Sequence, residues 1–229
     1  MNTKLPSDYE VSTVSHYDAY AAEFCENTAS VDMSELYAPF LHEIPAGGRI
    51  LDAGCGSGRD SLAFLKKGYQ VVSIDASAKM VNATTMLTGQ EAKLLRFDAL
   101  EFDREFDGIW ACASLLHIAR RDLNPILTRL TKALKPNAVL YLSFKHGDGE
   151  RMEGGRFFND LDETLLRTAL ANHPPLKLVR VWITEDVRND RRGGQSWRSW
   201  IQHLEQLDQI QTFCTGLRCR RANALPERR

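Results

Sequence analysis

The amino-acid sequence predicts an α/β fold, in which a mostly parallel sheet is covered by helices on both faces. Strand and helix patterns alternate along most of the 229 residues, and the helical segments are about ten residues long. One short apolar strand, at 49–53, leads through a cluster of glycines directly into a helix. Hydrophobic residues make up 43% of the chain, which is enough to fill a sizeable core. Alternating strands and helices of this kind build parallel sheets.

Each element follows from its own pattern of apolar residues. Residues spaced as on one helix face predict a helix around Tyr17 and Phe24, and residues 31–41 predict a second helix with Asp32 as its N-cap. Further helices are predicted at 60–67, 77–87, 122–134 and 161–171, and strands at 49–53, 69–74, 93–97, 106–111, 138–144 and 177–183. Residues 197–204 fit either a last strand or the start of a helix.

The chain is predicted to form one domain, residues 1–213, because no linker interrupts this alternation. Within the domain, N-terminal helices at 14–42 precede an α/β core at 48–204. Residues 214–229 carry five arginines against one glutamate and show little apolar periodicity. This stretch is therefore expected to be a basic, flexible tail.

Composition and charge exclude several classes of protein. A charged residue interrupts every apolar run before it reaches the ~18 residues of a membrane span, and the first ten residues do not form a secretory signal. The five cysteines form no C-x-x-C pair, so we expect neither a disulfide framework nor a metal site. Reduced thiols predict a cytoplasmic protein. The net charge of −1 argues against broad electrostatic binding of nucleic acid.

The most informative segment is the glycine cluster. Gly54, Gly56 and Gly58 stand at alternate positions, where the chain must turn sharply and where a Cβ would meet a bound ligand. A dinucleotide-binding loop would place its third glycine at position 59, which is Arg59 here. Asp52, two positions before the first glycine, suits the ammonium of S-adenosylmethionine and would repel a pyrophosphate. The segment therefore favours S-adenosylmethionine over a nicotinamide dinucleotide.

Two further carboxylates follow the next strands. Asp75 comes after the strand at 69–74 and 17 residues after Gly58, near the offset at which an acidic residue binds ribose hydroxyls. The alternative role for Asp75 is that of a helix N-cap. Asp98 closes the strand at 93–97 and is a candidate acceptor for an adenine amino group. Its alternative role is that of an ordinary turn residue.

Four motifs in this order resemble the signature of class I S-adenosylmethionine-dependent methyltransferases. They are Leu51-Asp-Ala-Gly-Cys-Gly-Ser-Gly, Ile74-Asp-Ala-Ser, Phe106-Asp-Gly-Ile-Trp-Ala-Cys-Ala-Ser-Leu-Leu-His and Leu134-Lys-Pro-Asn-Ala-Val-Leu. In the last motif Asn137-Ala138 replaces the two glycines that are usual in the family. The resemblance covers about residues 14–184. Within it, Gly56–Ser61 is more similar to the tellurite-resistance-type small-molecule methyltransferases.

The resemblance implies both a fold and a cofactor site. The fold is a Rossmann-like, doubly wound sheet of seven strands, mostly parallel, with one antiparallel strand near the C-terminus. The helices at 14–42 would lie over the cofactor as a lid. The residues expected to bind S-adenosylmethionine are Tyr17, Asp52, Ala53, Gly54, Gly56, Gly58, Asp75, Ala76, Asp98, Ala99 and Ala113.

The methyl acceptor is expected beside the cofactor, next to the polar, glycine-rich segment 144–158, which suits a mobile substrate loop. His117 is the candidate general base, and a purely structural histidine is the alternative. Arg59, Lys145 and Arg156 would form a cationic rim that binds the acceptor. The acceptor is expected to be a small molecule, and a soft or already anionic one would need alignment alone. An RNA or protein methyltransferase, and a cofactor-binding regulator without catalysis, are the alternatives.

Overall fold

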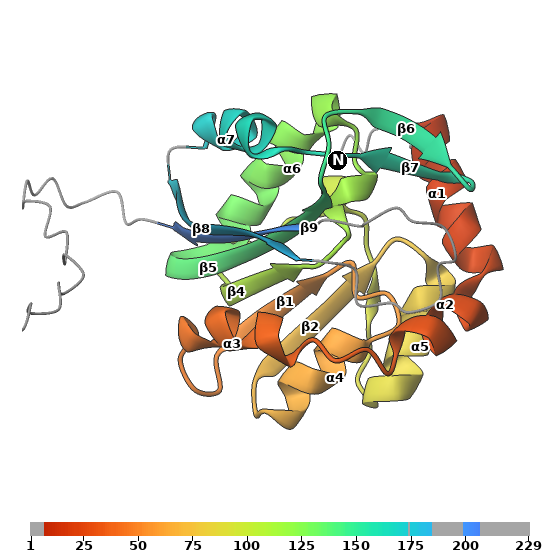
Figure 1. Cartoon of the computed structure of the whole chain (residues 1–229). Coiled ribbons are helices and arrows are strands. Elements are labelled where there is room, and N and C mark those ends of the chain that lie inside the picture. The colour runs from red at the N-terminus through yellow and green to blue at the C-terminus, as the bar shows by residue number, and fades with distance from the viewer. Residues whose placement is uncertain (1–6, 174, 185–198, 207–229) are drawn as a thin grey trace, which may run out of the picture.

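The computed structural model of the chain describes residues 7–173, 175–184 and 199–206. It confirms an α/β fold with a parallel central sheet between two layers of helices (Figure 1). One layer contains α3 (Ser34–His42), α4 (Arg59–Lys66) and α5 (Ala78–Thr88), and the other contains α6 (Arg120–Ala133) and α7 (Glu163–Ala171). The predicted tail at 214–229 lies outside the described residues, and the single domain at 1–213 stays a prediction.

The sheet has the order β3-β2-β1-β4-β5-β9-β8 within the described part of the chain. These strands are β1 (Arg49–Ala53), β2 (Gln70–Asp75), β3 (Lys93–Leu94), β4 (Phe106–Ala111), β5 (Leu134–Lys145), β8 (Leu176–Thr184) and β9 (Ser199–Gln206). The five strands from β3 to β5 run parallel, and β9 pairs antiparallel with β5 and with β8. The segment for which strand and helix both stayed open is thus a strand.

The order of the strands reverses at β1, which lies between β2 and β4. After β1 the chain continues toward the β3 edge, and after β4 it continues toward β5. In open sheets of this kind the crevice at the carboxyl ends of the strands, beside such a reversal, is the usual ligand site. The glycine cluster that follows β1 lies at this position.

The strand predicted at 93–97 is shorter in the structure. The backbone N–H of Leu95 donates to the carbonyl oxygen of Asp75, the last residue of β2, at 2.9 Å. Because β2 ends there, no partner strand remains for the following residues, and β3 consists of Lys93–Leu94. The chain continues into a 3₁₀ turn, Phe97–Ala99.

The expectation of a loop throughout 144–158 is wrong, because this segment contains most of a β-hairpin. β6 (Glu150–Glu153) pairs antiparallel with β7 (Arg156–Asn159). The glycine pair 154–155 connects them with φ angles of +56° and +79°. Two residues with positive φ match the twist of a tight hairpin, which glycine adopts without steric cost. The hairpin packs against α1 (Asp8–Ala19) (Figure 1).

Both faces of the sheet are covered by apolar side chains that alternate along each strand. Leu51 and Ile109 belong to a cluster with α6, whereas Ile50, Trp110 and Tyr141 belong to an aromatic cluster with α3 and α4. Alternation with a period of two sends neighbouring side chains to opposite faces. The rings of Trp110 and Tyr141 stack with centroids 3.7 Å apart. Because both faces of the sheet are buried, the sequences of its strands are continuous runs of apolar residues.

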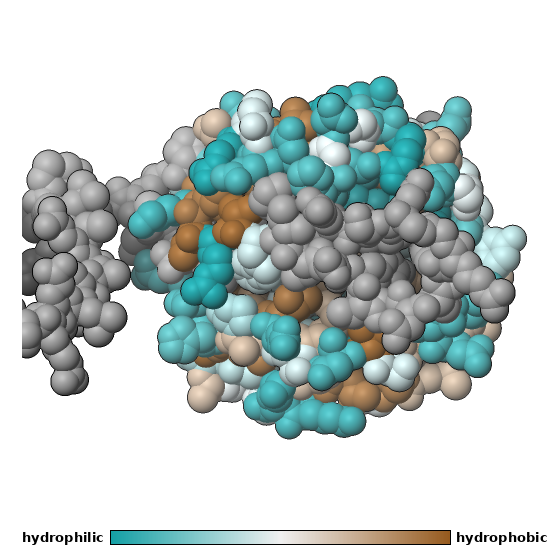
Figure 2. Space-filling view, viewed as in Figure 1, coloured by the Kyte–Doolittle hydropathy of each residue, from teal (hydrophilic) through white to brown (hydrophobic). Residues whose placement is uncertain are grey.

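On the face shown in Figure 2, the visible surface of the described residues is mainly hydrophilic. Figure 2 shows hydrophilic residues over most of the side viewed in Figure 1, with apolar residues in separate patches. No helix within the described ranges is both long enough and apolar enough to cross a membrane.

Candidate active site

A cavity of about 820 Å³ lies at the carboxyl ends of β1, β2, β4 and β5. The first two helices, α1 and α2 (Ala21–Thr28), the β6–β7 hairpin and the segments 31–36 and 95–98 also contribute to its lining. Its volume is in the range of small-molecule and cofactor sites. Eleven residues predicted to function line it, namely Tyr17, Gly54, Gly56, Arg59, Asp75, Ala76, Asp98, Ala113, His117, Lys145 and Arg156. The structure does not bring Asp52, Ala53, Gly58 or Ala99 to the cavity wall.

The glycine loop is shaped by two different constraints. Gly54 has φ +88°, and a Cβ on it would lie 2.4 Å from the Cβ of Ser114. Gly56 has φ +53°, and its Cβ would lie 3.2 Å from the ring of Phe24 on α2. Glycine is favoured at both positions because L-residues rarely adopt positive φ. Gly54 thus permits close packing within the protein, whereas Gly56 keeps the wall beneath α2 free of a side chain.

Asp75 is held firmly at the edge of the cavity. Its Oδ2 accepts a hydrogen bond from the Gly56 N–H at 3.0 Å, and its Oδ1 accepts one from the Ser77 N–H at 2.9 Å. Burial raises the pKa of Asp75 above its usual value. The N-cap of α5 is Ser77, whose Oγ accepts from the N–H of Met80. The alternative role of Asp75 as a helix N-cap is therefore wrong.

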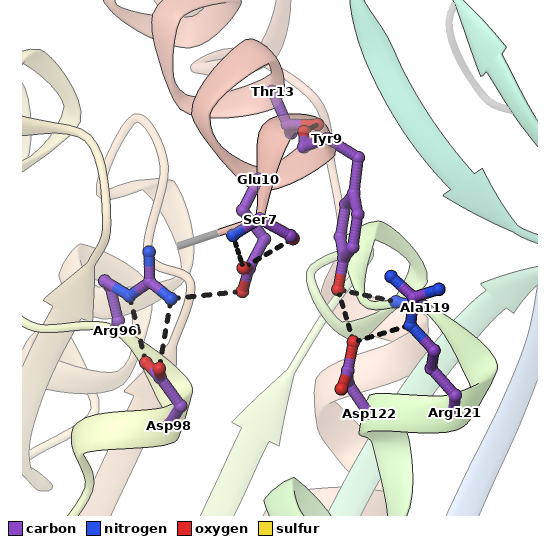
Figure 3. A network of polar contacts seen from close by, with 9 residues as sticks. All are labelled: Ser7, Tyr9, Glu10, Thr13, Arg96, Asp98, Ala119, Arg121 and Asp122. Carbon is purple, nitrogen blue, oxygen red and sulfur yellow. Dashed lines mark hydrogen bonds and ion pairs between the residues drawn. The ribbon is translucent and has the colours of Figure 1, made fainter. Parts of the chain in front are cut away.

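Asp98 belongs to a chain of ionic contacts that links α1 to the sheet (Figure 3). Arg96 donates to both carboxylate oxygens of Asp98, at 2.9 and 3.0 Å, and to Glu10 of α1 at 3.2 Å. Glu10 also accepts a hydrogen bond from the Ser7 N–H at 2.7 Å and so caps the N-terminus of α1. These contacts fix the plane of the Asp98 carboxylate at the cavity wall.

The same helix is attached to the core at two further points. Tyr9 donates from its hydroxyl to Asp122 at 3.0 Å, and the hydroxyl oxygen accepts from the Ala119 N–H at 3.3 Å (Figure 3). At the other end of α1, the Asp18 carboxylate accepts from the Ser77 hydroxyl at 2.5 Å. α1 is therefore positioned over the cavity by contacts with three separate parts of the fold.

Asp52 points away from the cavity. Its side chain is buried and accepts a hydrogen bond from the Ser61 hydroxyl at 2.5 Å. Burial, together with the nearby Asp60, raises the pKa of Asp52 to about 8. The expected contact between Asp52 and a ligand ammonium thus has no support in the geometry. Asp52 instead has a structural role through its buried hydrogen bond with Ser61.

Arg59 lines the cavity, but its positive charge is neutralised by the neighbouring carboxylate of Asp60. Its Nε and Nη2 donate to the two oxygens of Asp60 at 2.6 and 3.0 Å. Asp60 also accepts from the Tyr37 hydroxyl at 2.5 Å and from the Trp110 indole N–H at 2.8 Å. Sequence reasoning missed this network, because the aromatic donors come from distant elements.

The end of β4 carries local backbone strain. Ala113 has φ +51°, although it is not a glycine. Its N–H donates to the Ser143 hydroxyl at 2.6 Å, and the next residue, Ser114, donates from its hydroxyl to the Ala53 carbonyl at 2.6 Å. Strained backbone of this kind concentrates at functional sites.

His117 is half-buried, and both of its ring nitrogens have partners. Nδ1 lies 2.7 Å from the carbonyl oxygen of Phe157, and Nε2 lies 2.8 Å from the Tyr17 hydroxyl. Because a carbonyl only accepts, Nδ1 carries the proton and Nε2 accepts from Tyr17. Burial lowers the pKa of His117 to about 3. His117 is therefore neutral and connects α1 to the hairpin.

Lys145 and Arg156 lie around one aromatic ring at the hairpin end of the cavity. The Lys145 ammonium is 3.5 Å and the Arg156 guanidinium 5.2 Å from the centroid of Phe158. Burial lowers the pKa of Lys145 to about 7 against the attraction of Glu153, and nearby arginines add to the decrease. Lys145 is therefore about half protonated at pH 7, and a bound anion favours its charged form. The site therefore has a glycine-and-carboxylate end and a cationic, aromatic end.

Residues 50–137 match the family model of a methyltransferase domain. Over 131 residues the chain is 31% identical to YqeM of Bacillus subtilis (strain 168), a protein named as a methyltransferase, with 54% of this chain and 53% of that protein covered. It is 29% identical over 106 residues to a ubiquinone biosynthesis O-methyltransferase of Xanthomonas axonopodis, with 43% and 44% covered. The chain spans about half the length of these two relatives.

Among solved structures, the fold is similar to that of 1,6-didemethyltoxoflavin-N1-methyltransferase from Burkholderia thailandensis. That crystal structure contains 1,6-didemethyltoxoflavin and S-adenosylhomocysteine. The TM-score is 0.67 at 20% sequence identity, and the match covers 91% of this chain and 94% of that chain. The likeness shows a shared fold. The narrower similarity of Gly56–Ser61 to tellurite-resistance-type enzymes stays a prediction.

Proposed function

We propose that the chain is a class I S-adenosylmethionine-dependent methyltransferase and that it transfers a methyl group to a small-molecule acceptor, since residues 50–137 match the model of a methyltransferase domain. The observation that carries the proposal is a single cavity with two chemically different ends. The glycine loop and Asp75 form one end, and the hairpin with Lys145 and Arg156 forms the other. Such a cavity holds a cofactor and an acceptor side by side.

The residues of the first end fit S-adenosylmethionine. The wall at Gly56 has no side chain, and the Asp75 carboxylate uses two of its roughly four acceptor positions on backbone N–H groups, which leaves others for ribose hydroxyls. We assign cofactor binding to Tyr17, Gly54, Gly56, Asp75, Ala76, Asp98 and Ala113. Asp52, Ala53, Gly58 and Ala99 support these residues from outside the cavity wall.

The bound cofactor supplies an electrophilic methyl group on a sulfonium sulfur. The task of this chain is to hold the acceptor in line with that methyl group and to exclude water. α1, α2 and the hairpin form the cover that excludes water, with Tyr17 and Phe24 on its inner side. The hydrogen bond from Ser12 to Gly155 joins α1 directly to the hairpin, and the contact of Tyr17 with His117, which also contacts Phe157, joins them indirectly.

His117 has a positioning role in this proposal. A general base works best when its pKa lies near the working pH, and the pKa of His117 is far below it. Its Nε2 is also occupied by Tyr17. The acceptor would then arrive as a soft or already ionised nucleophile, which needs alignment and no proton transfer to the protein.

Two related proteins support a small acceptor. One is named for ubiquinone biosynthesis, and the other was crystallised with 1,6-didemethyltoxoflavin. The three described cysteines, Cys25, Cys55 and Cys112, have free thiols, and we propose that the protein acts in the cytoplasm. An RNA or protein substrate, or binding without catalysis, is an alternative outcome of the test below.

The test uses the purified chain, methyl-labelled S-adenosylmethionine and a metabolite extract, with total RNA and total protein as parallel substrates. We expect label in a small-molecule product and calorimetric binding of S-adenosylhomocysteine. Gly56→Val should abolish both while circular dichroism stays unchanged. Label in RNA or protein alone, or cofactor binding with no labelled product from any fraction, would contradict the proposal.

A further inference from the structure

We propose that the acceptor is an organic acid, and that Lys145 and Arg156 bind its negatively charged group at the hairpin end of the cavity. This inference rests on the proposed methyltransferase function and names the class of its substrate. It differs from the cationic rim expected from the sequence, because it leaves out Arg59. That arginine forms a double hydrogen bond with Asp60 and has its counter-charge inside the protein.

The first observation is that three cations surround the ring of Phe158 and that two of them, Lys145 and Arg156, line the cavity. Lys145 lies 3.5 Å from the centroid of Phe158, and Arg156 lies 5.2 Å from it and 5.9 Å from the ring of Tyr17. All four residues line the cavity. Cations are attracted to ring faces, but two cations at one ring also repel each other. An anion between them removes this repulsion.

The second observation is that the carboxylates nearest to these cations bind other residues and leave Arg156 without an ion pair in the described part of the chain. Lys145 is 3.6 Å from Glu153, but Glu153 is half exposed and also binds Arg151 at 3.1 Å. Asp160 pairs with Arg151 as well. Both carboxylates are thus engaged by Arg151, and among the described residues no carboxylate forms an ion pair with Arg156.

The third observation is the burial of the donors. The side chain of Lys145 is 8% exposed. The Nε of Arg156 is buried and has no hydrogen-bond partner in the part of the chain that the structure describes. A buried charged donor without a partner is unfavourable, and a bound carboxylate that accepts from it relieves this penalty. The guanidinium lines the cavity, so a ligand there can reach it.

The position of the pair indicates what else the acceptor contains. Lys145 ends β5, two strands away from β1 and its glycine loop, which is ~10 Å at the usual strand spacing. The wall between the two ends includes Leu116, Ile118 and Phe158, which are apolar. An inorganic oxyanion would leave this apolar space unfilled. An organic acid fills it, with its charged group at Lys145 and Arg156 and its nucleophile nearer the end of β4.

The experiment measures the binding of benzoate, of its neutral isostere benzamide, and of inorganic phosphate to the full chain saturated with S-adenosylhomocysteine. Ligand-observed NMR titrations would give the dissociation constants. The variants are Arg156→Gln, Arg156→Lys and Lys145→Met. Arg167→Gln serves as the matched control, because Arg167 is an exposed arginine of α7 that pairs with Glu163.

We expect benzoate to bind at least tenfold more tightly than benzamide and than phosphate. Arg156→Gln and Lys145→Met should each weaken benzoate binding about tenfold, Arg156→Lys should weaken it less, and Arg167→Gln should change it less than twofold. Equal binding of benzoate and benzamide, tighter binding of phosphate, or benzoate binding unchanged in both Arg156→Gln and Lys145→Met would overturn the inference.

Affinity for S-adenosylhomocysteine separates this inference from the proposed function. All four variants should bind S-adenosylhomocysteine within twofold of the parent chain, which also shows that they are folded. If one cavity variant fails this check, the other still tests the site. If the parent chain does not bind S-adenosylhomocysteine, the proposed function fails, whatever benzoate does.

Discussion

Alanine substitution at Gly54 should mainly lower stability and at Gly56 should mainly weaken cofactor binding, although the two glycines are separated by one residue. Both have positive φ, +88° and +53°. At Gly54 the new Cβ would lie 2.4 Å from the Cβ of Ser114, a buried residue that cannot easily move. At Gly56 it would lie 3.2 Å from the ring of Phe24, which needs to shift by only a few tenths of an ångström. Gly54→Ala should therefore destabilise the fold, and Gly56→Ala should mainly obstruct the cavity.

The magnitudes follow from two contributions. A residue with a Cβ in the left-handed region costs about 1–2 kcal/mol, and overpacking of a filled interior costs about 1–3 kcal/mol more. We therefore expect Gly54→Ala to lose about 2–5 kcal/mol of unfolding free energy and Gly56→Ala about 1–2 kcal/mol. Gly89→Ala is the matched control, because Gly89 has φ +70° and nothing within 4 Å of the added Cβ.

Urea unfolding and calorimetric titration with S-adenosylhomocysteine measure the two effects. Gly56→Ala should weaken binding at least tenfold, with the stability of Gly89→Ala. Ser114→Gly removes the clashing Cβ, so Gly54→Ala should cost about 1–3 kcal/mol less in that background. The reasoning is refuted if Gly54→Ala is no less stable than Gly89→Ala, or if the coupling to Ser114 is absent.

Three other predictions test the interior of the site. In the folded protein the pKa of Asp52 is raised to about 8, so unfolding releases a proton between about pH 4 and pH 8. The contribution of Asp52 to the free energy of unfolding is therefore fully present below pH 4 and is lost as the pH rises to 8. Asp52→Asn should reduce the slope of unfolding free energy against pH in this range by up to about 1.4 kcal/mol per pH unit. Urea titrations in which the variant and the parent chain show parallel curves would contradict this. Tyr17→Phe removes the bond to His117, worth about 1 kcal/mol, and should speed amide exchange in α1 roughly fivefold, whereas the exposed Tyr20→Phe should not. Asp60→Asn leaves the Arg59 guanidinium without its counter-charge and should lose about 3–5 kcal/mol of unfolding free energy; a loss below 1 kcal/mol would show that Asp60 is dispensable.

Short-range features of the chain were predictable because they depend on neighbouring residues. The alternation of strands and helices, the glycine turn after β1 and the carboxylate of Asp75 at the end of β2 all follow from local patterns of apolar, acidic and glycine residues. The carboxyl ends of parallel strands meet at one edge of a sheet. Local patterns therefore also predicted that most of the candidate residues would converge on one cavity.

Predictions from local sequence patterns were wrong where a side chain could point in several directions or a segment could pair with several partners. The acidic residue before the glycine loop reads as a ligand contact, yet Asp52 turns inward to Ser61. The glycine-rich stretch after β5 reads as a loop, yet the pair at 154–155 suits a hairpin turn and β6 and β7 form on either side of it. Each choice depends on packing against a second segment, which the local sequence does not specify.

The chemical state of the site's side chains was decided only by the tertiary structure. His117 depends on Tyr17, one hundred positions earlier, and on Phe157, forty positions later, and together they make it a neutral connector. The charge of Arg59 is cancelled by an aspartate that aromatic residues from other elements hold in place. Lys145 and Arg156 acquire their shared environment because the hairpin folds back over β5. The residue types were visible in the sequence, but burial and distant partners determine which of them carry a charge that a ligand can reach.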